Sequence, residues 1–222
     1  MTKGKKQNTV PFLDHGLWFP SVETANADGL LAVGGDLRVE RLLLAYKNGI
    51  FPWFNENSLI LWWSPDPRMV LYPKNISISK SMRKVMRSGI FKLKKNTNFN
   101  QVLHHCAGVE RKGQEGTWIT EEMVTAYREL HAKGVAHSYE VYEGGALVGG
   151  LYGIDLGHVF CGESMFSLKP NASKFAFISL AQELQEKGYR CIDCQLYTDH
   201  LASLGAQEIS RNDYMALLNQ AD

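Results

Sequence analysis

HSYEVYEGGALVGGLYGIDLGHVFCGESMF, residues 137–166, carries the strongest fold signal in the chain. Three runs that favour strands are separated by the turns EGG and DLG, which predicts two consecutive hairpins. A helix is expected next, over about residues 172–187, and then a further strand, YRCIDCQL (189–196). Antiparallel strands, a long helix and another strand predict an α+β fold, with a mixed, mainly antiparallel sheet on which helices pack.

The chain before this stretch indicates a smaller unit. We expect a helix over about residues 38–48, an aromatic corner at IFPWF (50–54) and a short strand over residues 59–63. SPDPR (64–68) then has two prolines, which do not fit inside regular structure. We therefore predict a small N-terminal domain over residues 1–65 that packs on a larger domain over residues 66–222. Other helices are expected over about residues 79–88, 98–106, 120–133 and 211–219.

Composition narrows the class of protein. Hydrophobic residues make up 45% of the 222 residues, enough for a full core without disulfides or a structural metal. No window approaches the roughly 20 apolar residues of a membrane helix. The basic start MTKGKKQNTV has no apolar run behind it, as a secretory signal would. We expect a cytoplasmic protein without a membrane partner.

The four cysteines are expected to be free thiols. Two of them form a C-x-x-C, a spacing that can mark a zinc or redox site. In a strand, however, residues three apart face opposite sides, so these two sulfurs can share neither a metal nor a disulfide. We predict no metal site. The four are Cys106, Cys161, Cys191 and Cys194.

The charges are segregated although the net charge is only +1. Residues 67–109 contain no Asp or Glu, and the rest of the chain sets 15 bases against all 23 acids. This pattern favours a polyanionic partner, since random placement would mix the signs. The nine bases of the segment are Arg68, Lys74, Lys80, Arg83, Lys84, Arg87, Lys92, Lys94 and Lys95.

The helix expected over residues 79–88 gathers four of these bases on one side and its apolar residues on the other. An ordinary amphipathic surface helix is the alternative, but such helices usually mix acids among their bases. We favour contact with nucleic-acid phosphates. The four bases are Lys80, Arg83, Lys84 and Arg87.

Three polar residues on expected strands are candidates for chemistry. Alternation places Asp193 and Gln195 on one side of their strand, where an Asp is disfavoured by propensity. Asp193 could instead pair with a Lys or Arg for structural reasons. Glu163 lies beside Gly162 in apolar company, where a carboxylate needs a specific partner. The structural alternative for Glu163 is an ion pair with Lys174.

Cofactor motifs are absent from the sequence. There is no G-x-x-x-x-G-K-[ST] phosphate loop, and GGLYG (149–153) lacks the lysine. SLKPNASK (167–174) has no paired glycines to hold a coenzyme A pyrophosphate at a helix start.

The tryptophans Trp53 and Trp118 lie on turns, where an indole could stack on a base.

Eight motifs together resemble, in order and spacing, the leucyl/phenylalanyl-tRNA–protein transferase family: FPWF, LWWSPDPR, GTWIT, HAKGVAHSYEV, GGLYG, FCGESMFS, NASK and IDCQ. The likeness runs from GLLAVGGDL (29–37) to DYMALLNQ (213–220). It implies transfer of Leu or Phe, and less readily Met, from aminoacyl-tRNA to proteins with N-terminal Arg or Lys, which marks them for degradation. It also implies a GNAT-like acyltransferase domain that has lost coenzyme A binding and uses no cofactor. We expect a monomer.

The resemblance also implies roles for single residues. Asp193 and Gln195 would be the catalytic pair, and Glu163 would hold the incoming substrate. The terminal adenosine of the tRNA would be bound by Trp53, Trp118, Tyr46 and Tyr127. The donor side chain would enter a pocket lined by Leu151, Phe160, Met165, Phe177 and Ile192.

The chemistry requires few groups, because an aminoacyl ester is already activated. Orientation of the reactants alone can supply up to ~7–11 kcal/mol. A glutamine amide is too weak a base to deprotonate an ammonium, so Gln195 is expected to position the reactants. Two alternatives remain open: an acetyl-CoA-dependent GNAT enzyme, whose order of elements is the same, and an RNA-binding protein without enzymatic activity.

Overall fold

The structure, a computed structural model, describes residues 10–108 and 119–220. Its N-terminal part forms a four-stranded sheet of order β1-β2-β4-β3. β1 and β2 are parallel, and the other pairs are antiparallel. The strands are β1 (Phe12–Leu13), β2 (Leu30–Gly34), β3 (Phe51–Pro52) and β4 (Leu61–Trp63), and α1 (Val39–Lys47) follows β2 as predicted.

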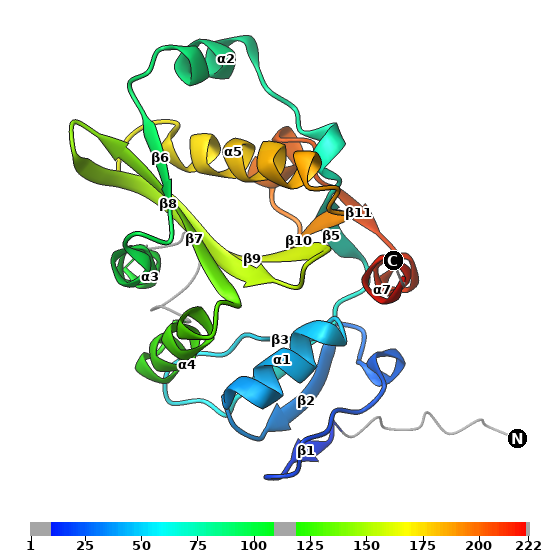
Figure 1. Cartoon of the computed structure of the whole chain (residues 1–222). Coiled ribbons are helices and arrows are strands. Elements are labelled where there is room, and N and C mark those ends of the chain that lie inside the picture. The colour runs from blue at the N-terminus through cyan, green and yellow to red at the C-terminus, as the bar shows by residue number, and fades with distance from the viewer. Residues whose placement is uncertain (1–9, 109–118, 221–222) are drawn as a thin grey trace, which may run out of the picture.

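The larger sheet has seven strands in the order β11-β5-β10-β9-β8-β7-β6 (Figure 1). All neighbours are antiparallel except β9 and β10, which are parallel. The strands are β5 (Arg68–Leu71), β6 (Lys92–Lys95), β7 (Ala136–Glu143), β8 (Ala146–Asp155), β9 (Val159–Ser167), β10 (Cys191–Gln195) and β11 (Gln207–Ile209). The predicted mixed, mainly antiparallel α+β fold is confirmed.

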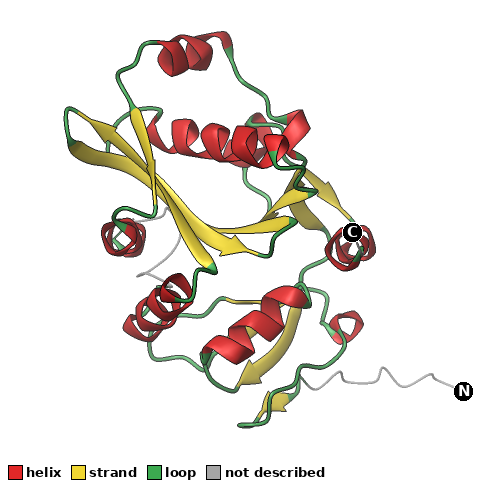
Figure 2. Ribbon diagram, in the orientation of Figure 1, coloured by secondary structure: helices red, strands yellow, loops and turns green. Residues whose placement is uncertain are grey.

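Helices cover both faces of this sheet (Figures 1 and 2). α5 crosses one face with an almost entirely apolar inner side. The four-stranded N-terminal sheet and α1, together called the N-terminal layer, lie on the opposite side with α3, α4 and α7. The helices that follow α1 are α2 (Lys80–Arg87), α3 (Phe99–Ala107), α4 (Glu121–Ala132), α5 (Ala172–Glu186), α6 (Asp199–Ser203) and α7 (Arg211–Asn219), and single turns of 3-10 helix span Val22–Thr24 and Pro73–Asn75.

Two hydrophobic clusters correspond to these two faces. The α5 cluster includes Leu71, Leu151 and Ile192 with the inner side of α5. The second cluster, here the N-terminal cluster, joins Trp62 of the small sheet to Cys191 of the large one. Packing of the N-terminal part on the rest was expected, because that part is too small for a comfortable core of its own. The boundary at residue 65 stays a prediction.

Close approach explains one glycine of the GGLYG run. A Cβ on Gly149 would lie 2.5 Å from Cβ of Ala172, the first residue of α5. Only a glycine therefore lets this helix begin so close to β8. Contact at this point fixes how α5, which carries Phe177, lies over the sheet.

The cysteines are free thiols, with Cys191 in the N-terminal cluster and Cys194 packed on the α5 cluster, so the two face opposite sides as expected. Within the described ranges, no three His, Cys, Asp or Glu side chains gather as metal ligands would. No helix in the described part of the chain is both long and apolar enough to cross a bilayer.

Candidate active site

A pocket of about 430 Å³ lies where β9 and β10 part. These two strands pair only over three residues each, Val159–Cys161 with Cys191–Asp193. Beyond that point, Gly162–Met165 line one wall and Cys194–Thr198 the other. Phe177 and Leu180 reach the pocket from the α5 side, and Phe51, Pro52 and Trp53 reach it from the N-terminal layer. The pocket is therefore open to groups from both faces of the sheet.

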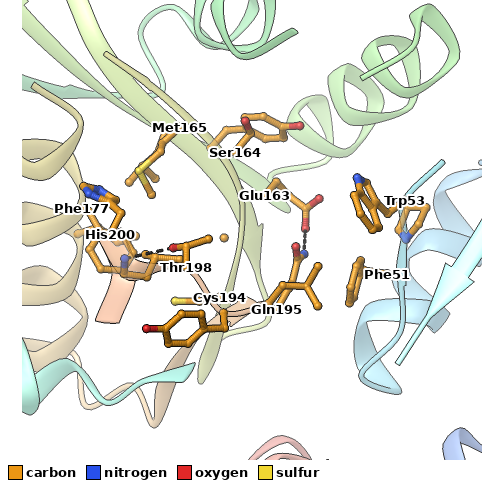
Figure 3. Close-up of a pocket in the computed structure, with 18 residues that line it drawn as sticks. Phe51, Trp53, Glu163, Ser164, Met165, Phe177, Cys194, Gln195, Thr198 and His200 are labelled. Atoms are coloured by element: carbon orange, nitrogen blue, oxygen red, sulfur yellow. Dashed lines mark hydrogen bonds between the residues drawn. The ribbon is translucent and has the colours of Figure 1, made fainter. Parts of the chain in front are cut away.

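Glu163 occupies a β-bulge in β9. Tyr152 of β8 pairs with Ser164 and Gly153 pairs with Gly162, so Glu163 is the extra residue. Bulges re-aim side chains, and they are common next to active sites. The alternation changes here: Cys161 and Phe166 both pack in the N-terminal cluster, although they are five residues apart. Glu163 points toward Gln195 across the gap between the strands (Figure 3).

Gln195 follows a second irregularity, in β10. Asp193 pairs with Val70 and Gln195 with Met69, which leaves Cys194 as the extra residue. The backbone of Gln195 is left-handed, with φ of 64°, which is uncommon for a residue with a side chain. This conformation brings its amide Nε2 within 3.0 Å of Oε1 of Glu163, to which it donates.

The carboxylate of Glu163 is held from two sides. The hydroxyl of Tyr127 donates to Oε2 at 2.8 Å, and the amide of Gln195 donates to Oε1. Only 7% of the residue is exposed. Burial raises the pKa of Glu163 to about 7, although the bonds from Tyr127 and Gln195 oppose this. The carboxyl can therefore gain or lose a proton near neutral pH. Lys174, the partner suggested as an alternative, is not among these bonded groups.

Asp193 lies behind the pocket rather than in its lining. Nε and Nη2 of Arg68 donate to its two oxygens at 2.8 and 2.7 Å, and the hydroxyl of Tyr214 donates to Oδ2 at 2.9 Å. Its link to Gln195 is through the backbone, because Gln195 N–H donates to Oδ1 at 3.0 Å. Asp193 thus stabilises the turn that orients Gln195. The structural alternative for Asp193, pairing with a Lys or Arg, is present in the structure as its ion pair with Arg68.

The aromatic residues assigned to adenosine divide into two groups. Trp53 lines the pocket and is half-buried, so part of the residue is accessible. Tyr46 and Tyr127 are 2% and 0% exposed, and their hydroxyls are hydrogen-bonded to each other. Buried rings cannot stack on a base, so in this structure these two tyrosines support Glu163 instead of offering a surface. Trp118 lies outside the described residues.

The residues predicted to line the donor pocket also fall into two groups. Leu151, Met165 and Phe177 line the cavity as predicted. Phe160 and Ile192 are 1% and 0% exposed and belong to the α5 cluster beneath it, so they support the lining without forming it.

Sequence reasoning missed several residues of the site. Arg68 was counted among the bases of a polyanion-binding segment, yet it is buried beside Asp193. The available signal was the apolar run MVL directly after it, which forms the rest of β5. Pocket residues without any earlier assignment are Phe51, Pro52, Tyr152, Ser164, Leu180, Cys194, Leu196, Tyr197, Thr198, His200 and Leu201.

The basic helix is confirmed as α2, with Ser79 as its N-cap. All four bases are exposed, while Met82 is buried in the α5 cluster. α2 lies beyond α5, on the opposite side of the sheet from the N-terminal layer (Figure 1). The basic β-strand residue Lys95, in contrast, pairs with Glu183 at 2.9 Å.

The fold and pocket define an α+β protein with an acid and an amide in the lining of a mainly apolar cavity. Residues 70–219 match the family model described as leucyl/phenylalanyl-tRNA protein transferase, and residues 35–66 match the model of its N-terminal domain. A relative of that name from Flavobacterium johnsoniae is 58% identical over 93% of this chain and 98% of its own. Another, from Christiangramia forsetii, is 55% identical over 90% of this chain and 95% of its own.

The chain therefore belongs to the leucyl/phenylalanyl-tRNA–protein transferase family and is an aminoacyltransferase. Among solved structures, a GCN5-related N-acetyltransferase from Kribbella flavida covers 76% of this chain and 60% of its own, with a TM-score of 0.39 and 11% identity.

Proposed function

We propose that this chain transfers Leu or Phe, and less readily Met, from aminoacyl-tRNA to the α-amino group of proteins with N-terminal Arg or Lys, which marks them for degradation. The observation that carries the proposal is the Glu163–Gln195 pair in a pocket whose lining is mainly apolar. The apolar lining suits an uncharged donor side chain, and the carboxylate suits a positively charged acceptor. A cytoplasmic location and a monomeric state remain predictions.

Glu163 is the group best suited to accept a proton from the acceptor. Its pKa of about 7 lies near the roughly 7.7–8.0 of an α-amino group, so the transfer is nearly balanced in energy. Gln195 uses its NH₂ on Glu163, and its carbonyl oxygen is the atom of the amide that can accept from the same ammonium. The pair can thus bind the ammonium and deprotonate it.

The bond changes then balance without a cofactor. The neutral amine attacks the ester carbonyl, the new C–N bond forms, and the C–O bond to the tRNA ribose breaks. The first proton of the ammonium stays on Glu163. A second proton passes from the attacking nitrogen to the departing ribose oxygen. Asp193 is a positioning residue in this scheme, because it touches Gln195 only through the backbone.

The tRNA is held outside the reacting centre. We assign Trp53 as a stacking surface for the terminal adenosine, since it borders the pocket opposite Phe177 (Figure 3). Lys80, Arg83, Lys84 and Arg87 of α2 are assigned to phosphate binding. Their joint replacement by Gln should reduce the slope of log K against log salt by about 0.7–0.9 for each phosphate that is no longer neutralised.

Transfer of labelled leucine from leucyl-tRNA to a protein with N-terminal Arg tests the proposal directly. Glu163→Gln should lower kcat at saturating acceptor by about 10²–10⁴-fold. Glu143→Gln, which neutralises a surface acid paired with Lys169, is the matched control and should keep full activity. The proposal is wrong if the wild-type chain labels no acceptor, or if acetyl-CoA serves as the donor. Full activity of Glu163→Gln would remove Glu163 from the chemistry.

A further inference from the structure

We infer that Tyr127 and Tyr46 are positioning residues for proton transfer at Glu163, so that the N-terminal layer takes part in the chemistry. This inference rests on the proposed role of Glu163 as proton acceptor. The two hydroxyls and the carboxylate of Glu163 form one series of hydrogen bonds that begins on α1, continues on α4 and ends on β9. Three elements far apart in the sequence therefore meet at one carboxylate.

The number of hydroxyl hydrogens decides which group donates in each of these hydrogen bonds. A tyrosine hydroxyl has one hydrogen, and that of Tyr127 is donated to Oε2 of Glu163. The contact between the two hydroxyls must then use the hydrogen of Tyr46. Both donors point toward the carboxylate, and Gln195 adds a third from the opposite side. Each favours the ionised form of Glu163, in which it is ready to accept a proton.

Burial and the charge of Asp193 act on Glu163 in the opposite direction. Asp193 on β10 disfavours the ionised form through its negative charge, and burial does so more strongly. Cys161, on the same strand as Glu163, has a raised pKa because it is buried, with the charges of Asp193 and Glu163 adding to the effect. In the described part of the chain, no cation is bonded to Glu163, so the two tyrosines and Gln195 must balance these effects.

A purely packing role does not account for the arrangement. A phenylalanine would fill the same volume at either position, and two hydroxyls buried this deeply require partners. Here their partners are each other and the carboxylate at the pocket. The geometry also explains why α4, which does not line the pocket, lies against both layers.

The test is the pH dependence of kcat between pH 6 and 8.5 in Tyr127→Phe and Tyr46→Phe, with one acceptor protein and leucyl-tRNA throughout. The activity of a base falls as pH falls through its pKa. Loss of a donor to the carboxylate raises that pKa, so the acid limb should move to higher pH. We expect a shift of about one unit for Tyr127→Phe and a smaller one in the same direction for Tyr46→Phe. Activity should recover at high pH.

Tyr139→Phe is the matched control. Tyr139 is a fully buried tyrosine of β7 in the α5 cluster, and it does not line the pocket. Its replacement should leave the profile unmoved. Equal loss of activity at every pH in Tyr127→Phe and Tyr46→Phe would show that both are structural, and this result would overturn the inference.

A second measurement separates this inference from the proposed function. Carbon NMR of glutamate labelled at Cδ follows the ionisation of Glu163 without any substrate, with Glu163→Gln identifying the signal. The titration midpoint should rise in both tyrosine variants, even if the wild-type chain transfers no leucine. An unchanged midpoint would overturn the inference, and absence of transfer with a raised midpoint would overturn only the proposed function. If one variant fails to fold, the other decides.

Discussion

Glu163 and Asp193 are buried carboxylates on neighbouring strands, and their surroundings are opposite. Asp193 is 1% exposed and receives two bonds from the guanidinium of Arg68, which is itself 2% exposed. Glu163 is 7% exposed and is bonded to neutral donors, the hydroxyl of Tyr127 and the amide of Gln195. The carboxylate of Asp193 has a cation at contact distance, whereas that of Glu163 has none among the described residues.

The difference shows that the partner, rather than burial itself, decides what a buried acid can do. A carboxylate locked to a guanidinium is neutralised and contributes to structure. A carboxylate bonded to neutral groups bears the cost of desolvation, and its pKa rises to about 7. Two acids that are alike in the sequence therefore become a structural anchor and a candidate base.

The largest effect should come from breaking the anchor. Arg68→Met leaves Asp193 charged and without a cation in the core, so the free energy of unfolding should fall by about 3–5 kcal/mol. Urea denaturation measures this loss. Arg68→Met combined with Asp193→Asn should recover much of it, because the buried charge is then gone.

The exposed pair between Arg38 and Asp36 provides the control for this prediction. The side chain of Arg38 is 54% exposed, so Arg38→Met should change stability by no more than about 1 kcal/mol. If the single and double variants at Arg68 lose equal stability, the charge on Asp193 is not the source of the cost.

A smaller effect, of opposite sign, is expected at Glu163. In the unfolded chain its carboxyl has a pKa of 4.5, and in the folded chain about 7. Between these pH values the folded chain binds the extra proton, so the contribution of Glu163 to stability falls as pH rises and levels off above pH 7. Glu163→Gln should therefore be more stable than wild type at pH 8, by up to roughly 3 kcal/mol, with little gain at pH 5.

Glu140 serves as the comparison for Glu163 in urea denaturation at both pH values. It is fully buried and accepts from the backbone of Thr97 and Asn98 and from the hydroxyls of Thr97 and Ser138. Because all four donors point at its two oxygens, the NH₂ group of a glutamine would leave donors without an acceptor, so Glu140→Gln should be destabilising at pH 8. A loss of similar size in Glu163→Gln would mean that Glu163 is also a structural acid.

The smallest effect concerns the space beside Glu163. A Cβ on Gly162 would meet only the carbonyl oxygen of Asp193, at an ordinary 3.5 Å, so Gly162→Ala should fold normally. Because Gly162 lines the pocket, the added methyl should weaken transition-state binding by about 1–3 kcal/mol and lower kcat/KM accordingly. The loss should be greater for phenylalanyl-tRNA than for leucyl-tRNA. Equal kcat/KM values in wild type and variant would place the donor side chain elsewhere.

Local patterns were enough to predict most elements of the fold. The two hairpins over residues 137–166, the helix that became α5 and the helices α2, α4 and α7 all appear where the sequence pattern predicted them. Strands β1, β2, β5, β6 and β11 were missed, because short strands have too few residues for a clear alternation. FPWF was read as a corner, yet Phe51–Pro52 pairs with β4.

The sequence by itself determined the family motifs, the α+β class and which residue types were available for chemistry. It did so because turn residues, caps and alternation act over a few neighbouring positions. Tertiary structure decided which acid could react. Strict alternation groups Asp193 with Gln195, but the two bulges and the arrival of Arg68 from β5 separate their side chains. Likewise, Tyr46 and Tyr127 are 81 residues apart, and only the packing of the N-terminal layer brings them to Glu163.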